Sequence, residues 1–237
     1  MGDESAPPKL SIIIPTMNEE AGIGSTLDLV HQAMRPSGMT YELLIVDTAS
    51  KDRTRDIAVA KGARVIDEPR RGYGRAYKTG FEQARGEIVA TLDADATYPA
   101  ERIPELVRTL ESEGLDFLTT DRFAMMQKGA MGFKHRFGNW VLSFTMRLLF
   151  RVPVRDSQSG MWVFRRSELP KWEITSDGMP MSEEIKIEAF RKSRGKEVGI
   201  EYRIRLGEVK LQSFSDGSRN LKFLFRKRFR SSRPPQA

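Results

Sequence analysis

The first 120 residues alternate short apolar runs with segments of helical periodicity, and this rhythm constrains the fold more than any other feature. Residues 10–14 form a β-prone apolar run that stops at Pro15, and residues 19–34 then carry apolar side chains at helical spacing. Strand–helix alternation is typical of a parallel sheet covered by helices on both faces. Further strands are predicted at 41–46, 63–66, 88–92 and 115–119, and further helices at 52–61, at 103–113 and in a segment ending near Arg85. We therefore predict an α/β fold with a mostly parallel sheet.

The second half of the chain is less regular. A helix with a wide apolar face is predicted at 133–150, a polar loop at 155–160, a strand at 161–164, a helix at 182–192 and a β-like run at 197–206 in which basic and apolar residues alternate. Ser50 and Ser182 are candidate helix caps, and Gly62 is a candidate helix stop.

Composition narrows the classes of function. The chain has 237 residues, no cysteine and two histidines, which excludes a disulfide framework, thiol chemistry and a histidine-rich zinc site. The first residues lack the apolar core of a signal peptide, and no run of about 18 apolar residues predicts a spanning helix. The net charge of +7 favours anionic partners, which include nucleotide phosphates, an anionic membrane face and nucleic acid.

Two aspartates, Asp93 and Asp95, follow the apolar run that begins at Ile88. On an extended segment, residues two apart point to the same side, so we expect both carboxylates to face one point. Hard ions such as Mg²⁺ and Mn²⁺ prefer such oxygen ligands and leave positions for water and phosphate. Because ligands bind beyond the carboxyl ends of strands in open sheets, Pro15, Asp47 and Asp93 are expected to converge on one edge.

Five motifs together resemble family 2 glycosyltransferases of the GT-A fold, a Rossmann-like nucleotide-diphospho-sugar transferase fold. Three of them, at residues 10–19, 45–50 and 92–95, are general to that family. The motifs Arg-Asp-Ser-Gln-Ser-Gly at 155–160 and Met-Ser-Glu-Glu-Ile-Lys-Ile-Glu at 181–188 are similar to those of dolichyl- and polyprenyl-phosphate sugar transferases. The resemblance covers residues 9–216, which we expect to form the catalytic domain between a disordered tail at 1–8 and a basic amphipathic segment at 217–237.

The resemblance implies a donor site for a GDP- or UDP-linked sugar. Asp93 and Asp95 would hold Mg²⁺ or Mn²⁺, and Asp47 would accept a hydrogen bond from the base. The family more often has a second acid beside that position, where this chain has Thr48. The implied donor-binding residues are Pro15, Met17, Glu19, Asp47, Arg75, Lys78, Asp93, Ala94 and Asp95.

The resemblance further implies inverting transfer of a hexose, mannose or glucose, to a polyprenyl or dolichyl phosphate. Arg122 and Arg136 would hold the acceptor phosphate and act with Asp95 in catalysis, and Gln158 and Ser159 would also contact the acceptor. A phosphate monoester has a second pKa of about 6, so this nucleophile needs no dedicated base at neutral pH. The alternative is a soluble family 2 enzyme with a hydroxyl acceptor and Glu183 or Glu184 as the base.

A polyprenyl acceptor lies in a bilayer, so the enzyme must reach a membrane surface. The helix at 133–150 and the basic tail, with Leu221, Leu224 and Phe225 on one face, are candidates for that contact. We expect a cytoplasmic protein that lies peripherally on the cytoplasmic membrane face, alone or with a membrane-protein partner. A nucleic-acid-binding protein is disfavoured because no base-stacking aromatic motif is found, and a non-catalytic membrane adaptor is disfavoured because it would not need the aspartate pair.

Overall fold

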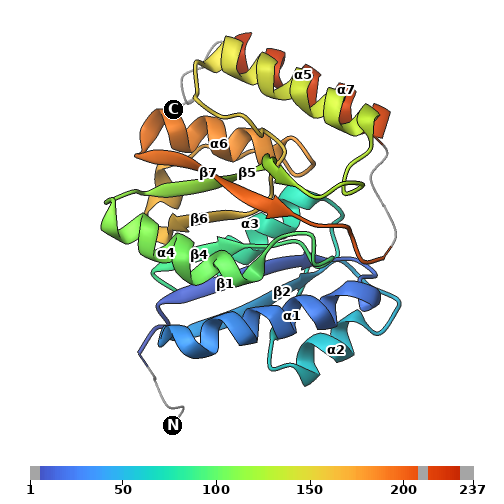
Figure 1. Cartoon of the computed structure of the whole chain (residues 1–237), viewed down its shortest axis with the longest axis vertical. Helices are drawn as coiled ribbons and strands as arrows, with labels where there is room; N and C mark the ends of the chain where they lie inside the picture. Colours follow the sequence, from blue (N-terminus) through green and yellow to red (C-terminus); the bar gives the residue numbers. More distant parts are fainter. Residues whose placement is uncertain (1–5, 208–212, 230–237) are drawn as a thin grey trace, which may run out of the picture.

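The computed structural model describes residues 6–207 and 213–229 and, within them, builds one mixed sheet of seven strands (Figure 1). The strands are β1 Leu10–Thr16, β2 Tyr41–Asp47, β3 Arg64–Asp67, β4 Ile88–Thr91, β5 Phe117–Met126, β6 Trp162–Arg165 and β7 Gly195–Tyr202. The α-helices are α1 Glu20–Met34, α2 Thr54–Ala60, α3 Tyr73–Gln83, α4 Ile103–Ser112, α5 Phe133–Phe150, α6 Met181–Lys192 and α7 Ser213–Phe229. Short 3₁₀ segments cover Arg35–Ser37, Ala100–Arg102 and Arg166–Lys171.

The strand order is β3-β2-β1-β4-β6-β5-β7, and only β6 runs antiparallel to its neighbours. The prediction of a mostly parallel α/β sheet is therefore confirmed. Thr16 lies opposite Asp47 in the register of β1 and β2, and Leu92 N donates to Ile13 O just beyond the end of β4. The carboxyl ends of these three strands consequently meet at one edge, as expected.

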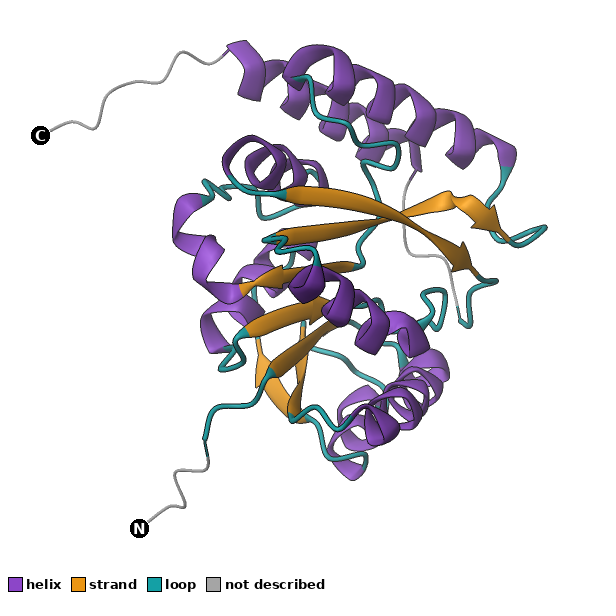
Figure 2. Ribbon diagram, turned by 60° about the vertical axis from the view of Figure 1, so that its left-hand side comes forward, coloured by secondary structure: helices purple, strands orange, loops and turns teal. Residues whose placement is uncertain are grey.

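Alternating side chains of β1 divide the interior into two cores, one on each face of the sheet. Helices lie over both faces of the sheet (Figure 2). Ile12 and Ile14 pack with residues of α1 and α4, whereas Ile13 packs with residues of α3 and α6. Because both faces are covered, the strands read as continuous apolar runs in the sequence rather than as an alternation.

A third, outer layer consists of α5 and α7, which lie side by side above α6 (Figure 1). Met146 and Phe150 of α5 pack with Phe223 and Leu224 of α7 and with Ile187 of α6. Helix α6 is thus covered on two sides, which explains why nine of its twelve residues are buried. The proposed division between residues 216 and 217 falls inside α7, and the proposed tail at 1–8 lies mostly outside the described residues.

Several local predictions need correction. Ser50 does not cap α2, because its hydroxyl donates to Asp47 Oδ1. Ser182 lies inside α6 and donates instead to the carbonyl groups of Ser157 and Ser159. Gly62 does end α2, with a left-handed φ of 76°.

Two strand boundaries also differ from those predicted. Pro15 lies within β1 rather than after it. The nitrogen of Pro15, which carries no hydrogen, faces the β4 side of the strand, where β4 has already ended at Thr91, so the sheet accommodates the proline. Strand β5 continues to Met126 because it pairs with β7 past a register shift between Asp121 and Met125.

Leu224, predicted to share an amphipathic face with Leu221 and Phe225, is fully buried against α5 and α6. Among the side chains of α7 that the structure describes, the exposed large apolar ones are Phe225 and Phe229.

Candidate active site

Asp93 and Asp95 lie in the turn that follows β4, so their alignment does not come from an extended backbone as predicted. The side chain of Asp95 is fixed locally instead. Its Oδ1 accepts hydrogen bonds from Thr97 N at 3.1 Å and Thr97 Oγ1 at 2.6 Å, while Ala96 adopts a left-handed φ of 58°. Asp95 is 2% exposed, and the turn therefore presents a rigid, nearly buried carboxylate at the strand edge.

Helix α1 presses directly on this turn. A Cβ atom on Gly22 would lie 2.6 Å from Ala94 O and 2.9 Å from Asp95 Cα, so only glycine permits the observed approach. Thr26 Oγ1, one helical turn further along α1, accepts a hydrogen bond from Ala96 N at 3.1 Å. The position of the aspartate pair is thus set by the packing of α1.

The carboxylate of Asp93 is poorly compensated by the protein. Burial and the nearby charge of Asp95 raise the pKa of Asp93 to about 7. A charge this costly to bury is stabilised when a cation approaches it. The turn is therefore an acidic corner with affinity for positive charge.

Among the described residues, Arg205 forms an ion pair with this corner, and the sequence analysis did not single it out. Its Nη1 lies 2.8 Å from Asp95 Oδ2, and its Nη2 lies 3.3 Å from Glu19 Oε1. Leu206 N donates to Asp95 O at 3.0 Å, which holds the segment after β7 against the turn. The alternation of basic and apolar residues at 197–206 was the only sequence signal for this residue.

The donor set fits a hard divalent ion that takes few protein ligands. Asp93 and Asp95 provide carboxylate oxygens, which Mg²⁺ and Mn²⁺ prefer. Within the described ranges no group of three or more histidine or acidic side chains converges on one point, so phosphate and water would complete the coordination. Arg205 would have to share or release Asp95 Oδ2, since it already contacts that atom.

Most of the other expected donor-binding residues surround the same edge but already have partners. Asp47 is fully buried and accepts hydrogen bonds from Thr16, from the main chain and hydroxyl of Ser50, and from Arg55. Arg75 and Lys78 of α3 both pair with Asp177, on the loop before α6. A base or phosphate contact at any of these side chains would replace an existing interaction.

Arg122 is nearly buried and is paired with Asp156. Its Nε and Nη2 donate to the two carboxylate oxygens at 2.7 and 2.9 Å, and its guanidinium lies 5.2 Å from the centroid of the Tyr202 ring. Burial alone would raise the pKa of Asp156, but the Arg122 guanidinium outweighs burial and holds this pKa below its usual range. Arg136, by contrast, is exposed on α5 and lines a separate cavity.

Gln158 and Ser159, expected to contact the acceptor, tie the polar loop to the neighbouring helices. Gln158 donates to Glu183 Oε1 at 2.9 Å and accepts from Asn220 Nδ2 at 2.8 Å, while Ser159 Oγ lies 2.7 Å from Thr120 Oγ1. The loop is thereby connected to both α6 and α7, a link that the sequence motifs did not reveal.

The two candidate bases differ in their surroundings. Glu184 accepts hydrogen bonds from Thr175 and Ser176 and pairs with Lys227 of α7, so it holds the loop before α6. Glu183 is fully buried, its Oε2 has no hydrogen-bond partner, and burial raises its pKa to about 8. Glu183 is therefore protonated at neutral pH, which makes it a poor base in the free enzyme.

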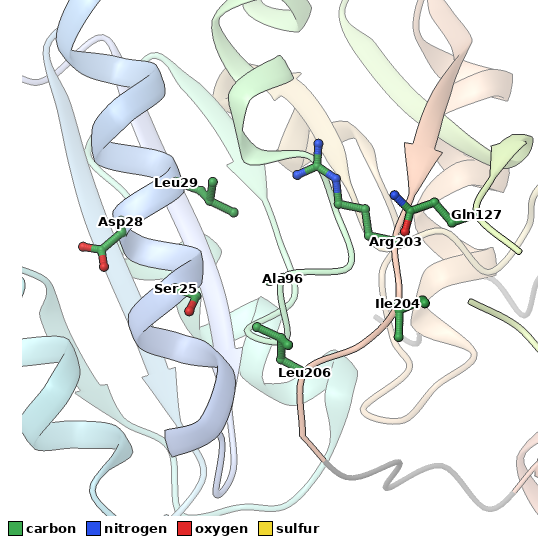
Figure 3. A pocket seen from close by; sticks show the side chains of 8 residues that line it. All are labelled: Ser25, Asp28, Leu29, Ala96, Gln127, Arg203, Ile204 and Leu206. Atoms are coloured by element: carbon green, nitrogen blue, oxygen red, sulfur yellow. The ribbon is translucent and has the colours of Figure 1, made fainter. Parts of the chain in front are cut away.

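A cavity of about 430 Å³ opens beside the acidic corner, between α1 and the segment after β7 (Figure 3). Its wall contains Ala96 from the turn but neither of the two aspartates. The lining residues are Ser25, Asp28, Leu29, Ala96, Gln127, Arg203, Ile204 and Leu206.

Comparison with known proteins identifies sequence relatives over most of the chain. The profile of the family described as Glycosyl transferase family 2 matches residues 11–171. The low-salt glycan biosynthesis hexosyltransferase Agl6 of Haloferax volcanii is 36% identical over 94% of this chain, which spans 54% of that protein. The dolichyl-phosphate hexose transferase of the same organism is 35% identical over 88% of this chain and 89% of its own length.

A relative with a shorter match and a solved structure extend these similarities. An undecaprenyl-phosphate 4-deoxy-4-formamido-L-arabinose transferase of Pseudomonas paraeruginosa is 38% identical over 48% of this chain and 35% of its own length. The crystal structure of glucosyl-3-phosphoglycerate synthase from Mycobacterium tuberculosis, in complex with Mn²⁺, UDP and glucosyl-3-phosphoglycerate, superposes with a TM-score of 0.75 at 23% identity. The match covers 93% of this chain and 80% of that one and establishes the GT-A fold.

Proposed function

Because the chain belongs to glycosyl transferase family 2, we propose that this glycosyltransferase moves a hexose from a GDP- or UDP-linked donor to a polyprenyl or dolichyl phosphate. The observation that carries the proposal is the aspartate pair at the shared edge of β1, β2 and β4, in which Asp95 is nearly buried and the pKa of Asp93 is raised. The similarity to a hexosyltransferase and to a dolichyl-phosphate hexose transferase supports the choice of sugar and acceptor.

The proposed chemistry is a single in-line displacement that inverts the anomeric centre. A Mg²⁺ or Mn²⁺ ion held by Asp93 and Asp95 would offset the negative charge that grows on the leaving diphosphate. Arg205, which contacts Asp95, adds a second positive charge beside the departing group. The chain's own residues therefore stabilise the leaving group, while Pro15, Met17, Glu19 and Asp47 would position the nucleoside.

The acceptor needs positive charge rather than a base, because a phosphate monoester is mostly deprotonated at neutral pH. Arg136 offers an exposed guanidinium for this purpose, and Arg122 is held beside the loop that contains Gln158 and Ser159. The raised pKa of Glu183 and the engaged oxygens of Glu184 speak against a hydroxyl acceptor that would require either as a base.

A membrane surface is the proposed location of the acceptor. Helix α5 exposes a continuous apolar face, with Phe137, Trp140 and Phe144 stacked along it, and Phe225 and Phe229 stack on the neighbouring α7. None of the helices in the described ranges is long and apolar enough to span a bilayer. We propose peripheral attachment at the cytoplasmic face through α5 and α7, either directly or beside a membrane-protein partner.

Transfer assays test the proposal. Labelled GDP-mannose, GDP-glucose, UDP-glucose and UDP-galactose are incubated separately with Mg²⁺ or Mn²⁺ and a short polyprenyl phosphate, with farnesol and a soluble sugar as hydroxyl acceptors. We expect labelled lipid phosphate from at least one donor and none after removal of the metal by chelation. Transfer to the hydroxyl acceptors alone would overturn the proposal.

A further inference from the structure

A second cavity, separate from the acidic corner, lies between α5 and the end of β5. It has a volume of about 350 Å³ and is lined by Asp121, Phe123, Ala124, Arg136, Trp140, Arg147 and Arg155. Three of these seven side chains are guanidinium groups, and they come from α5 and from the start of the polar loop. Arginine is the side chain best suited to bind phosphate, because its planar fork can donate two parallel hydrogen bonds.

These three arginines lack the partners that other arginines of the chain have. Among the described residues, no carboxylate lies within salt-bridge distance of Arg136, Arg147 or Arg155. Arg122 and Arg203, for comparison, are both paired with carboxylates. Glu197 accepts hydrogen bonds from the main-chain N–H of Arg155, but not from the Arg155 guanidinium. The cluster therefore keeps its positive charge for a ligand.

The charge of the cavity matches one phosphate monoester. Three guanidinium groups and the single carboxylate of Asp121 leave a net of two positive charges. A phosphate monoester carries about −1.5 to −2 at pH 7, whereas the phosphodiester of an ordinary phospholipid carries about −1. A monoester dianion thus neutralises the cavity, and a phosphodiester leaves it cationic.

The arginine cavity also adjoins the apolar face of α5. Arg136 and Arg147 are eleven residues apart, so they project within about 20° of each other around the helix. Trp140 lines the cavity and also belongs to the exposed apolar face. That face consists of Phe133, Phe137, Trp140, Phe144 and Leu148, which are 82%, 57%, 54%, 47% and 69% exposed. A ligand with a phosphate in the cavity could therefore extend an apolar chain directly along α5.

We propose that Arg147 and Arg155, together with Arg136, bind the phosphate head group of a polyprenyl phosphate whose chain lies on the apolar face of α5. This assignment rests on the proposed function for the identity of the acceptor. It assigns the main contacts with the acceptor phosphate to the three arginines that have no carboxylate partner among the described residues. Arg122 contributes less to phosphate binding, because Asp156 already neutralises its charge.

Fluorescence of Trp140 tests this binding without donor or metal, because Trp162 and Trp172 are only 0% and 6% exposed. Farnesyl phosphate is titrated against the full chain, with farnesol, inorganic phosphate and short-chain phosphatidylglycerol as separate arms. We expect farnesyl phosphate to bind most tightly, and Arg147→Gln and Arg155→Gln each to weaken it about tenfold. Lys134→Gln is the matched control, since it removes one charge from α5 outside the cavity. Thermal midpoints check that each variant is folded.

Equal binding of farnesol or phosphatidylglycerol, or equal behaviour of the arginine variants and Lys134→Gln, would overturn the inference. Transfer assays keep its failure distinct from failure of the proposed function. If sugar transfer to farnesyl phosphate occurs but its KM is unchanged in Arg147→Gln and Arg155→Gln, the inference is wrong and the proposed function stands. If farnesyl phosphate binds as expected but accepts no sugar, the head-group site stands and the proposed function is wrong.

Discussion

Replacing Arg205 by glutamine is expected to strengthen metal binding in the absence of nucleotide. Arg205 contacts Asp95 Oδ2 at 2.8 Å, so a metal ion that takes this oxygen must displace or share the guanidinium. The Asp95 side chain is 3% exposed and that of Arg205 is 24% exposed, which places the pair mostly out of water. A hydrogen bond between charged groups contributes about 1.5–3 kcal/mol, and we take the lower value because Arg205 retains some contact with solvent.

A difference of about 1.5 kcal/mol corresponds to about a tenfold change in the dissociation constant. We therefore expect Arg205→Gln to bind Mn²⁺ about ten times more tightly than the unmodified protein when no nucleotide is present. The measurement is a titration followed by the EPR signal of free Mn²⁺ at pH 8, above the pKa of about 7 for Asp93.

The matched control is Arg203→Gln. Arg203 lies on the same segment and is 26% exposed, but its guanidinium pairs with Glu101 and Glu201 rather than with the aspartate pair. This variant should bind Mn²⁺ like the unmodified protein. Unchanged or weaker Mn²⁺ binding by Arg205→Gln would refute the view that Arg205 competes with a metal ion at Asp95.

Three further predictions follow from the geometry of the site. Gly22→Ala should lower the free energy of unfolding by about 1–3 kcal/mol and weaken donor binding, because its Cβ would meet Ala94 O at 2.6 Å. The control is Gly24→Ala, whose Cβ would have no neighbour nearer than 3.5 Å, and it should be neutral or stabilising in thermal melts. The pKa of Asp93 is raised from 3.8 to about 7, so the folded state keeps a proton that the unfolded chain loses, and stability falls as pH rises between these values. Asp93→Asn should therefore raise the Tm of the metal-free protein at pH 8 but not at pH 4, and an equal effect at both would contradict this reasoning. Glu183→Gln should reduce the transfer rate only a few-fold, because Glu183 is not expected to act as a general base. A loss of about 10²–10⁴-fold, which removal of a general base produces, would contradict this prediction.

The sequence predicted the architecture well because its signals are local and repeated. Buried parallel strands appear as short apolar runs, and Gly62 marks the end of α2 through its left-handed backbone. Helix α5 was predicted with the bounds that the structure has, Phe133–Phe150. The Ser50 and Ser182 caps were wrong because distant partners, Asp47 and the 155–160 loop, compete for their hydroxyl groups.

Prediction of the site was limited by contacts between segments far apart in the chain. Asp93 and Asp95 were identified by residue type, but the features that position them are Gly22 of α1 and the turn at Thr97. Arg205 reaches Asp95 across more than 100 residues of sequence, and no spacing rule connects two such positions. The arginine cavity likewise combines α5 with a loop and with the end of β5, which only the folded chain brings together.

The most direct test of the account counts the Mn²⁺ ions bound per chain in the presence of a nucleoside diphosphate. We expect one bound ion in the unmodified protein and loss of that ion in both Asp93→Asn and Asp95→Asn. Asp28→Asn, which alters an acidic residue in the cavity of Figure 3, should leave it in place. Retention of one Mn²⁺ per chain in both Asp93→Asn and Asp95→Asn would contradict the assignment of the acidic corner as the metal and diphosphate site.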